Sequence, residues 1–180
     1  MAITLPEELT RALAEVRGLL ETHSKGVSWA STVSIHLTLK FIGELPEEKA
    51  GKAGEMLVEA AGGIAPFTVT VEGIGAFPSL KAPRVVWVGV KREQTLLTLA
   101  ANIDLRLACV GIEKDSRPFH PHLTLCRIKT PEAGSELSRI IEGRKPQIMM
   151  DFPVRSFVLF RSELRAGGAI HTPLKTISLG

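Results

Sequence analysis

Apolar residues recur at helical spacing in two segments of the chain, and a proline followed by glutamate marks the start of two further helices. In the first, Leu9, Leu13, Val16 and Leu20 follow each other at intervals of three or four residues after Pro6. This spacing gives an apolar helix face, and proline fits the first helical turn. The predicted helices cover residues 6–22, 46–61, 93–109 and 131–142.

Between these helices, apolar or β-branched residues alternate with polar ones, which is typical of strands. The polar segment 22–34 and the Gly- and Pro-rich segment 73–83 are predicted to be loops, and Gly167 with Gly168 predicts a turn. The mixed order of helices and strands predicts an α+β fold, with antiparallel sheets covered by helices on one side. The predicted strands are 2–5, 36–42, 67–71, 84–90, 152–160 and 170–179, and one that begins at residue 122.

The tetrapeptide His-Leu-Thr-Leu occurs twice, at residues 36–39 and 122–125, about half of the 180-residue chain apart. In a strand, alternate side chains share a face. Each copy therefore presents an imidazole and a hydroxyl together, over a leucine face that packs in the core. One copy alone would be typical of a core strand with two satisfied polar groups, but two identical copies indicate a shared function. They also suggest two similar lobes that face each other.

Composition limits the class of protein. With 180 residues, 44% of them hydrophobic, 23% charged and a net charge of +3, the chain fits one domain or two lobes with a shared core. The charge permits an anionic ligand without requiring one. Cys109 and Cys126 have no metal-binding or disulfide-framework spacing, and no apolar run approaches a membrane span. We therefore expect a cytoplasmic protein without membrane contact.

Two facing His-x-Thr pairs suit chemistry at a phosphate. One neutral imidazole can act as general base and one charged imidazole as general acid, because imidazole titrates near neutral pH. The two Thr hydroxyls can hold non-bridging oxygens during in-line displacement. Such a site requires no metal ion.

Other chemistries have weaker support in the sequence. The segment His120-Pro121-His122 resembles half of a metal site, but no third ligand has a supportive spacing. A nucleophilic pair of Cys126 and His122 lacks an orienting partner, so Cys126 is interpreted as a core residue. The sequence has no phosphate-binding loop, dinucleotide fingerprint or G-x-S-x-G motif.

The paired motifs and their flanks resemble the 2H phosphoesterase superfamily. Within it, the chain is most similar to the RNA 2′,3′-cyclic phosphodiesterases, which are also called the 2′-5′ RNA ligase family. The resembling segments are residues 2–6, 35–44, 84–89, 117–127, 157–162 and 172–174.

The resemblance implies a single domain, residues 1–180, of two interleaved lobes related by a pseudo-two-fold axis. Each lobe would have an antiparallel sheet with helices outside, and a cleft would separate the lobes. The implied reaction is hydrolysis of RNA 2′,3′-cyclic phosphate ends to 2′-phosphomonoesters, without a cofactor. His36 would donate a proton to the leaving 3′-oxygen, His122 would accept a proton from water, and Thr38 and Thr124 would hold the phosphate. Reversal toward 2′-5′ ligation would exchange the roles of the histidines.

The resemblance also implies further substrate contacts. Phe41 falls where the family has an aromatic residue that stacks on the terminal base, and Arg117 and Arg127 are candidate phosphate contacts. Strict alternation from His36 and His122 would turn Phe41 and Arg127 away from the site. Two more candidates are Lys40, on the His36 face, and His120, on the His122 face. The last histidine, His171, falls where relatives often have Tyr, and it is interpreted as structural.

Two alternatives remain open. The same residues would suit a small cyclic nucleotide or ADP-ribose cyclic phosphate, and a non-catalytic module that binds RNA ends is the alternative from another functional class. The expected partner is RNA with cyclic phosphate ends, such as tRNA halves, and the expected state is a monomer.

Overall fold

Two antiparallel sheets form the centre of the protein. The computed structural model describes residues 1–21, 25–165 and 168–180. Sheet A has the strand order β3-β1-β8-β9, and sheet B has the order β2-β6-β5-β4-β7. The strands of sheet A are β1 (Ala2–Thr4), β3 (His36–Thr38), β8 (Ser156–Arg165) and β9 (Gly168–Ser178). The strands of sheet B are β2 (Val27–Trp29), β4 (Phe67–Phe77), β5 (Val85–Val90), β6 (His122–Ile128) and β7 (Met149–Val154).

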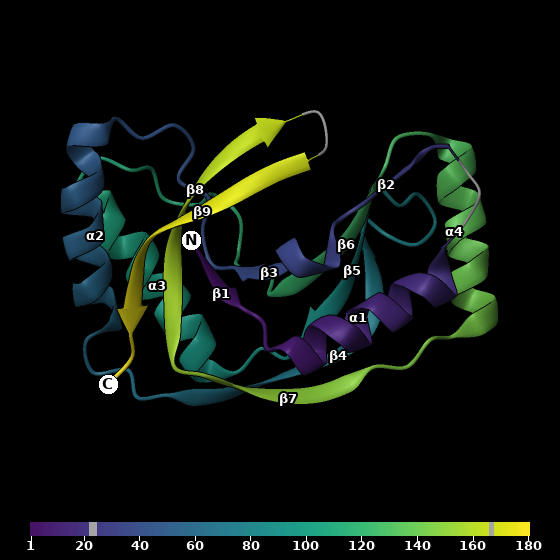
Figure 1. Ribbon diagram of the computed structural model, residues 1–180, viewed down its shortest axis with the longest axis horizontal. Helices are drawn as coiled ribbons and strands as arrows, with labels where there is room; N and C mark the ends of the chain where they lie inside the picture. The colour runs from purple at the N-terminus through teal and green to yellow at the C-terminus, as the bar shows by residue number, and fades with distance from the viewer. Residues whose placement is uncertain (22–24, 166–167) are drawn as a thin grey trace.

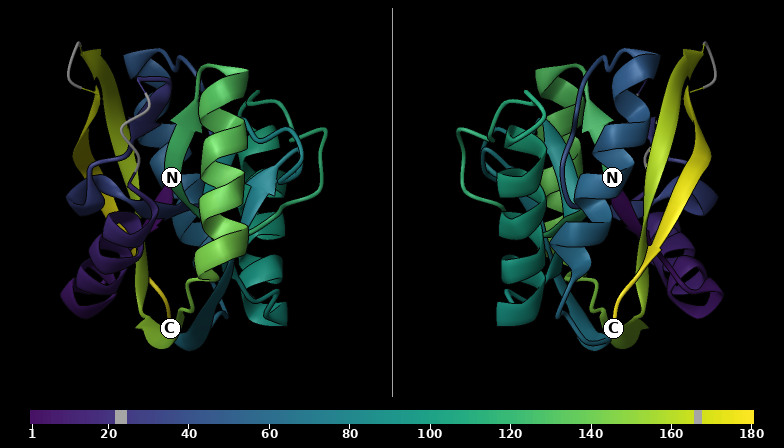
Figure 2. Two further views of the ribbon diagram at one scale, coloured as in Figure 1. Left: turned by 90° about the vertical axis from the view of Figure 1, so that its right-hand side faces the viewer. Right: turned by 90° about the vertical axis from the view of Figure 1, so that its left-hand side faces the viewer.

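The α-helices lie outside the sheets, toward the two ends of the molecule (Figure 1). Helix α2 packs against α3 and β9, whereas α4 packs against α1 and β6. Figure 2 shows α1 and α3 on opposite flanks of the molecule. This arrangement confirms the α+β fold with two antiparallel sheets and outer helices. The helices are α1 (Glu7–Leu20), α2 (Glu47–Ala61), α3 (Gln94–Ala108) and α4 (Pro131–Arg144), and a 3₁₀ turn, η1, covers Thr32–Ser34.

The helix boundaries follow local sequence signals. All four apolar residues predicted to form the inner face of α1 are buried. Helix α4 begins after Thr130, whose hydroxyl accepts a hydrogen bond from the Ala133 amide at 3.3 Å, a typical N-cap. It ends at Arg144, because the next residue, Lys145, has a left-handed backbone with φ of 42° that stops the helix.

One predicted strand is in fact two strands in different sheets. The sequence predicts a single strand over residues 152–160, but β7 ends at Val154 in sheet B and β8 begins at Ser156 in sheet A. The sequence gives no sign of this change of sheet, because buried apolar residues occur on both sides of Arg155. They are Phe152 and Val154 before it and Phe157 after it.

Three further differences between the predicted and the observed elements occur where the strands are short or irregular. The predicted loop 22–34 contains β2 and η1, and β4 continues to Phe77 through a register shift next to Gly73, whose φ is +68°. Strand β3 ends at Thr38, earlier than expected. Residue 22, at the predicted end of the first helix, and Gly167, in the predicted turn, lie outside the described residues.

Both sheets and all four helices contribute to one continuous hydrophobic core. Leu9 of α1, Leu57 of α2, Leu99 of α3 and Leu137 of α4 all belong to the same cluster of buried side chains. The lobes are therefore joined by packing as well as by chain crossings. Among the helices of the described residues, none has the length and apolarity that a membrane crossing requires.

Candidate active site

The two His-Leu-Thr strands face each other although they belong to different sheets. Strand β3 is the edge of sheet A, β6 lies between β2 and β5 in sheet B, and the two strands are in contact. The central leucines, Leu37 and Leu123, are fully buried. The flanking histidines and threonines are half-buried, as the alternation predicts. The fold thus brings the two motifs together.

The local environments of the two motifs are equivalent over eight residues. Residues 35–42 and 121–128 have the same sequence of buried, half-buried and exposed positions. In both segments the alternation breaks after the second leucine, so that two successive residues are buried and the next is exposed. Phe41 and Arg127 are this exposed residue in the first and second motif.

Each motif histidine is held by a backbone carbonyl two residues upstream. The Nδ1 atom of His36 lies 2.9 Å from the Ser34 oxygen, and Nδ1 of His122 lies 2.7 Å from the His120 oxygen. A carbonyl oxygen only accepts, so each Nδ1 donates its hydrogen. The nitrogen that remains for proton transfer is therefore Nε2 in both rings.

Burial lowers the pKa of both imidazoles below the ordinary value of 6.5. The hydrogen bonds to Ser34 and His120 oppose this shift, whereas nearby positive groups reinforce it: His171 and the chain amino terminus at His36, and His120 and Arg127 at His122. Both rings are thus mostly neutral at neutral pH. A bound phosphate anion would favour the charged form that a proton donor needs.

Aromatic rings surround both imidazoles. The His36 ring is perpendicular to His171 at 4.8 Å and nearly parallel to Phe160 at 6.1 Å between ring centroids. The His122 ring is perpendicular to Phe77 at 5.1 Å. Sequence reasoning missed these three neighbours, because their approach depends on strand register and bending.

The position of the Trp87 ring beside His122 requires a glycine at residue 75. The Trp87 ring lies 6.3 Å from the His122 ring and covers Gly75 of β4. A Cβ atom at Gly75 would come within 2.2 Å of the indole, so no larger residue fits there without moving Trp87.

A β-bulge turns Arg127 toward the site. Val86 pairs with Cys126 and Trp87 pairs with Thr124, which leaves Leu125 as an extra residue in β6. The bulge shifts the alternation by one. Arg127 pairs with Val85, on the β5 face that carries Trp87, and its charge acts on His122. Strict alternation from His122 would turn Arg127 away from the site, and the bulge reverses this expectation.

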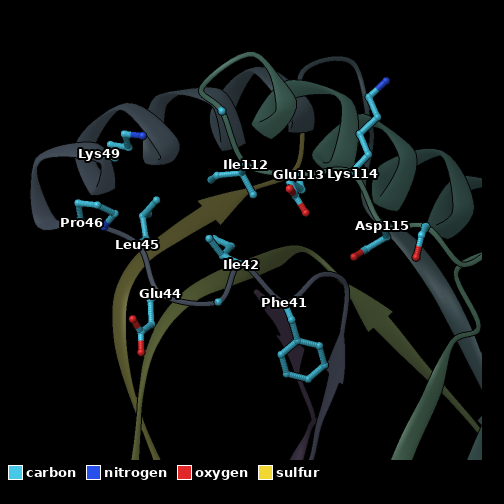
Figure 3. Close-up of a pocket in the computed structure, with 13 residues that line it drawn as sticks. Phe41, Ile42, Glu44, Leu45, Pro46, Lys49, Ile112, Glu113, Lys114 and Asp115 are labelled. Atoms are coloured by element: carbon cyan, nitrogen blue, oxygen red, sulfur yellow. The ribbon is translucent and has the colours of Figure 1, made fainter.

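The alternation of side chains along β3 does not determine the direction of Phe41, because β3 ends at Thr38. Its side chain is 75% exposed, and it lines a pocket of about 480 Å³ between residues 41–46 and 111–116. Figure 3 shows Phe41 on one side of this pocket and Glu113 and Asp115 on the other, with the Lys114 side chain pointing away. The pocket therefore adjoins Phe41 rather than the imidazoles.

Lys40 does not lie in the cleft. It is 2% exposed, and its ammonium donates to Asp104 at 2.5 Å and to the Glu113 carbonyl at 2.8 Å, with Asp115 at 3.4 Å. This burial corrects its expected place beside His36. The break in alternation after Leu39 turns Lys40 inward.

The segment before β6 carries exposed basic groups. Arg117 and His120 are both exposed, and the His120 ring lies 6.2 Å from the ring of His122. Arg92 donates to the Phe119 carbonyl at 3.0 Å and adds a cation at this segment. Sequence reasoning missed Arg92, because a lone arginine after a strand carries no signal.

Cys126 is a core residue. It is 1% exposed, and burial raises the pKa of its thiol to about 12. At neutral pH it is protonated and a poor nucleophile. Separately, no cluster of three or more His, Cys, Asp or Glu side chains within residues 1–21, 25–165 and 168–180 has the arrangement of a metal site.

Comparison with known proteins gives one consistent result. The family described as "LigT like Phosphoesterase" matches residues 3–87 and again residues 88–171. The RNA 2′,3′-cyclic phosphodiesterase of Archaeoglobus fulgidus is 34% identical over 96% of this chain and 92% of its own length. The protein of the same name from Methanothermobacter thermautotrophicus is 28% identical over 99% and 97%.

Solved structures agree with the sequence matches. The crystal structure of TT0787 from Thermus thermophilus has a TM-score of 0.82 at 32% identity and covers 99% of this chain and 95% of its own. E. coli LigT complexed with 3′-AMP has a TM-score of 0.74 at 29% identity, with the same coverage. The double match of one family to the two halves agrees with the two equivalent motifs.

Proposed function

The chain belongs to the LigT-like phosphoesterase family, and on that premise we propose that it is an RNA 2′,3′-cyclic phosphodiesterase. The observation that carries the proposal is the pair of facing His-x-Thr strands. In each, a backbone carbonyl holds Nδ1 and leaves Nε2 for proton transfer. The names of the relatives support the substrate.

In the proposed mechanism, two imidazoles act on opposite sides of phosphorus. Nε2 of His122 accepts a proton from water while the water oxygen bonds to phosphorus. The bond from phosphorus to the 3′-oxygen breaks, and Nε2 of His36 donates a proton to that oxygen. The product is a 2′-phosphomonoester with a free 3′-hydroxyl.

The threonines would hold the phosphate between the imidazoles. The hydroxyls of Thr38 and Thr124 share strand faces with His36 and His122 and can donate to the non-bridging oxygens. The negative charge held there would raise the pKa of the donor His36 and favour its charged form. The mechanism assigns no step to a metal ion.

The exposed residues around the cleft are proposed substrate contacts. Phe41 would stack on the terminal base, an interaction of about 1–3 kcal/mol per base. Arg117, Arg127 and His120 would contact phosphates. All four side chains are exposed, and the bulge places Arg127 on the His122 face of β6, which supports these proposed contacts.

The same site would also accept an RNA 5′-hydroxyl in place of water, which gives a 2′-5′ linkage as a second proposed reaction. We expect RNA ends such as tRNA halves as substrates and a monomer as the active form, because one chain carries both motifs. A reducing, cytoplasmic setting is supported by the free thiols of Cys109 and Cys126.

The test is incubation with a short RNA that ends in 2′,3′-cyclic phosphate, in the presence of EDTA. We expect conversion to the 2′-phosphate. His36→Asn and His122→Asn should each lower kcat by about 10²–10⁴-fold, the usual range for loss of a general acid or base. Arg106→Gln, an exposed change on α3, is the control and should leave the rate unchanged.

Other outcomes would select the alternatives. Turnover that stops with EDTA and returns with a divalent cation would contradict metal independence. Turnover of 2′,3′-cyclic mononucleotides or ADP-ribose cyclic phosphate, but not of RNA, would indicate a small-molecule enzyme. Binding of the RNA end without turnover would indicate a binding module.

A further inference from the structure

The outer half of the β8–β9 hairpin brings His171 to the proton-donor end of the cleft. Ser162 and His171 are opposite each other in the register of the two strands, so their side chains share a face. A register shift between Leu159 and Phe160 interrupts the hairpin, and both strands change direction along their length (Figure 1). This arrangement accounts for the approach of a β9 residue to His36 across β1.

The contacts of His171 are specific. Its Nδ1 lies 2.8 Å from the Ser162 hydroxyl, and its ring is perpendicular to that of His36, at 86° and 4.8 Å between centroids. Phe160 lies 6.1 Å from each of the two imidazoles. The His36 ring is thus bounded by the Ser34 carbonyl, a nearly parallel ring and a perpendicular ring.

The second motif has the same geometry with a different residue. The His122 ring is perpendicular to Phe77, at 89° and 5.1 Å. A perpendicular ring is therefore common to both motifs, but it is a hydrocarbon at His122 and an imidazole at His36. The comparison separates two properties of His171: the perpendicular ring contact, which the motifs share, and a titratable nitrogen in that ring, which Phe77 lacks. The imidazole beside His122 is instead that of His120, at 6.2 Å and tilted by 59°.

We propose that His171 is a positioning residue: its ring, packed perpendicular to the His36 ring, fixes the orientation of His36 and so aims Nε2 of His36 at the substrate. The kinetic part of this inference rests on the proposed phosphodiesterase function. A small loss of orientation at a reacting group lowers the rate strongly, by up to about 10²-fold for a displacement of 1 Å.

The imidazole has an electrostatic consequence as well. A charge on His171 lowers the pKa of His36, as does the chain amino terminus at the start of β1. Among the side chains that the structure describes, the other charged or titratable groups of the surrounding strands are Arg161 and Glu163 on β8, Lys175 on β9, and His122 and Arg127 on β6. Replacing His171 by Phe would keep the perpendicular ring and remove one of these influences.

The first arm of the test needs no activity. The ring protons of His36 are followed by NMR as a function of pH in the wild type, His171→Phe and His171→Ala. In His171→Phe, the pKa of His36 should rise while that of His122 stays constant, and the nuclear Overhauser contact between His36 and Phe160 should persist. In His171→Ala that contact should weaken. An unchanged contact in His171→Ala would overturn the proposal.

The second arm measures kcat and KM with the cyclic-phosphate RNA. In His171→Ala, kcat should fall by about tenfold to a hundredfold while KM changes little, and His171→Phe should keep kcat near the wild-type value. Thr172→Ala, the next position on β9, with an exposed side chain, is the matched control. Wild-type kcat in His171→Ala, or an equal loss in His171→Phe, would overturn the proposal. If the wild type itself shows no turnover, the proposed function fails while the NMR arm still decides the positioning role.

Discussion

At the scale of single residues, the two motif histidines have equivalent surroundings in two respects. A backbone carbonyl holds Nδ1, and partial burial keeps each ring neutral at neutral pH. Burial favours the neutral ring because it removes water from the charged form. The site therefore disfavours charge on His36 and His122 until an anion is bound.

The depressed pKa values predict how stability depends on pH. In the unfolded chain His36 and His122 take up protons near pH 6.5, but in the folded protein they do so only at lower pH. Between these values the unfolded state binds more protons, so the free energy of unfolding decreases as the pH falls through 6.5. The loss is complete below the folded pKa values.

Urea unfolding at about pH 7.5 and pH 5.5 measures this effect. We expect a smaller decrease in the free energy of unfolding for the double variant His36→Asn/His122→Asn than for the wild type. An equal decrease in both proteins would show that the two imidazoles do not cause it.

The sequence predicted the placement of the motif side chains better than the placement of the side chains around them. Identical tetrapeptides placed His36 and His122 on equivalent strand faces without any knowledge of the fold. Alternation failed at Phe41 and Arg127, because a strand end and a one-residue bulge are set by pairing with other strands. His171 was missed as a neighbour of His36 because their contact depends on a hairpin that bends across another strand.

At the scale of elements, Lys40 joins three segments that are distant in sequence. It follows β3, pairs with Asp104 on α3, and binds Glu113 and Asp115 in the segment that leads toward β6. The Asp115 amide also donates to Asp104 at 3.0 Å. These contacts fix one wall of the pocket beside Phe41.

Removing the ammonium of Lys40 should therefore destabilise the protein. We expect Lys40→Met to lower the free energy of unfolding by about 3 kcal/mol, the low end of the range for breaking a buried ion pair, because Asp104 and Asp115 remain partly exposed. Arg106→Met breaks an exposed ion pair between α3 and Glu59 of α2 and should cost about 0–1 kcal/mol. Equal losses in urea unfolding would contradict the role of Lys40.

The elements themselves were largely predictable where their periodicity is long. The four helices were found either from the spacing of apolar residues, as in α1 and α3, or from a proline followed by glutamate at the helix start, as in α2 and α4. Strand β2 was missed because three residues give no period, and the change of sheet at Arg155 was missed because both sheets accept buried apolar side chains.

At the scale of the whole molecule, the two halves of the chain share both sheets. Sheet A takes β1 and β3 from the first half and β8 and β9 from the second, and sheet B likewise combines β2 and β4 with β6 and β7. One hydrophobic cluster spans both sheets. The chain therefore cannot be divided between residues 87 and 88, where the two family matches meet, without breaking both sheets.

We accordingly expect one cooperative unfolding transition. Trp29 and Trp87 both lie in sheet B, so their fluorescence reports that sheet, whereas far-UV circular dichroism reports all helices and strands. The two signals should give the same urea midpoint and slope. Two separated transitions would show that the lobes unfold independently.

The unequal ring neighbours of His36 and His122 have an evolutionary consequence. Two identical half-length chains paired about a true two-fold axis would give both histidines the same surroundings, and thus the same proton affinity. A single chain that contains both copies is free of this constraint, because a mutation in one copy leaves the other unchanged. His171 on one side and Phe77 on the other are such a divergence. A single chain with two copies of the motif thus allows the two imidazoles to differ in proton affinity, which the proposed division into an acid and a base would require.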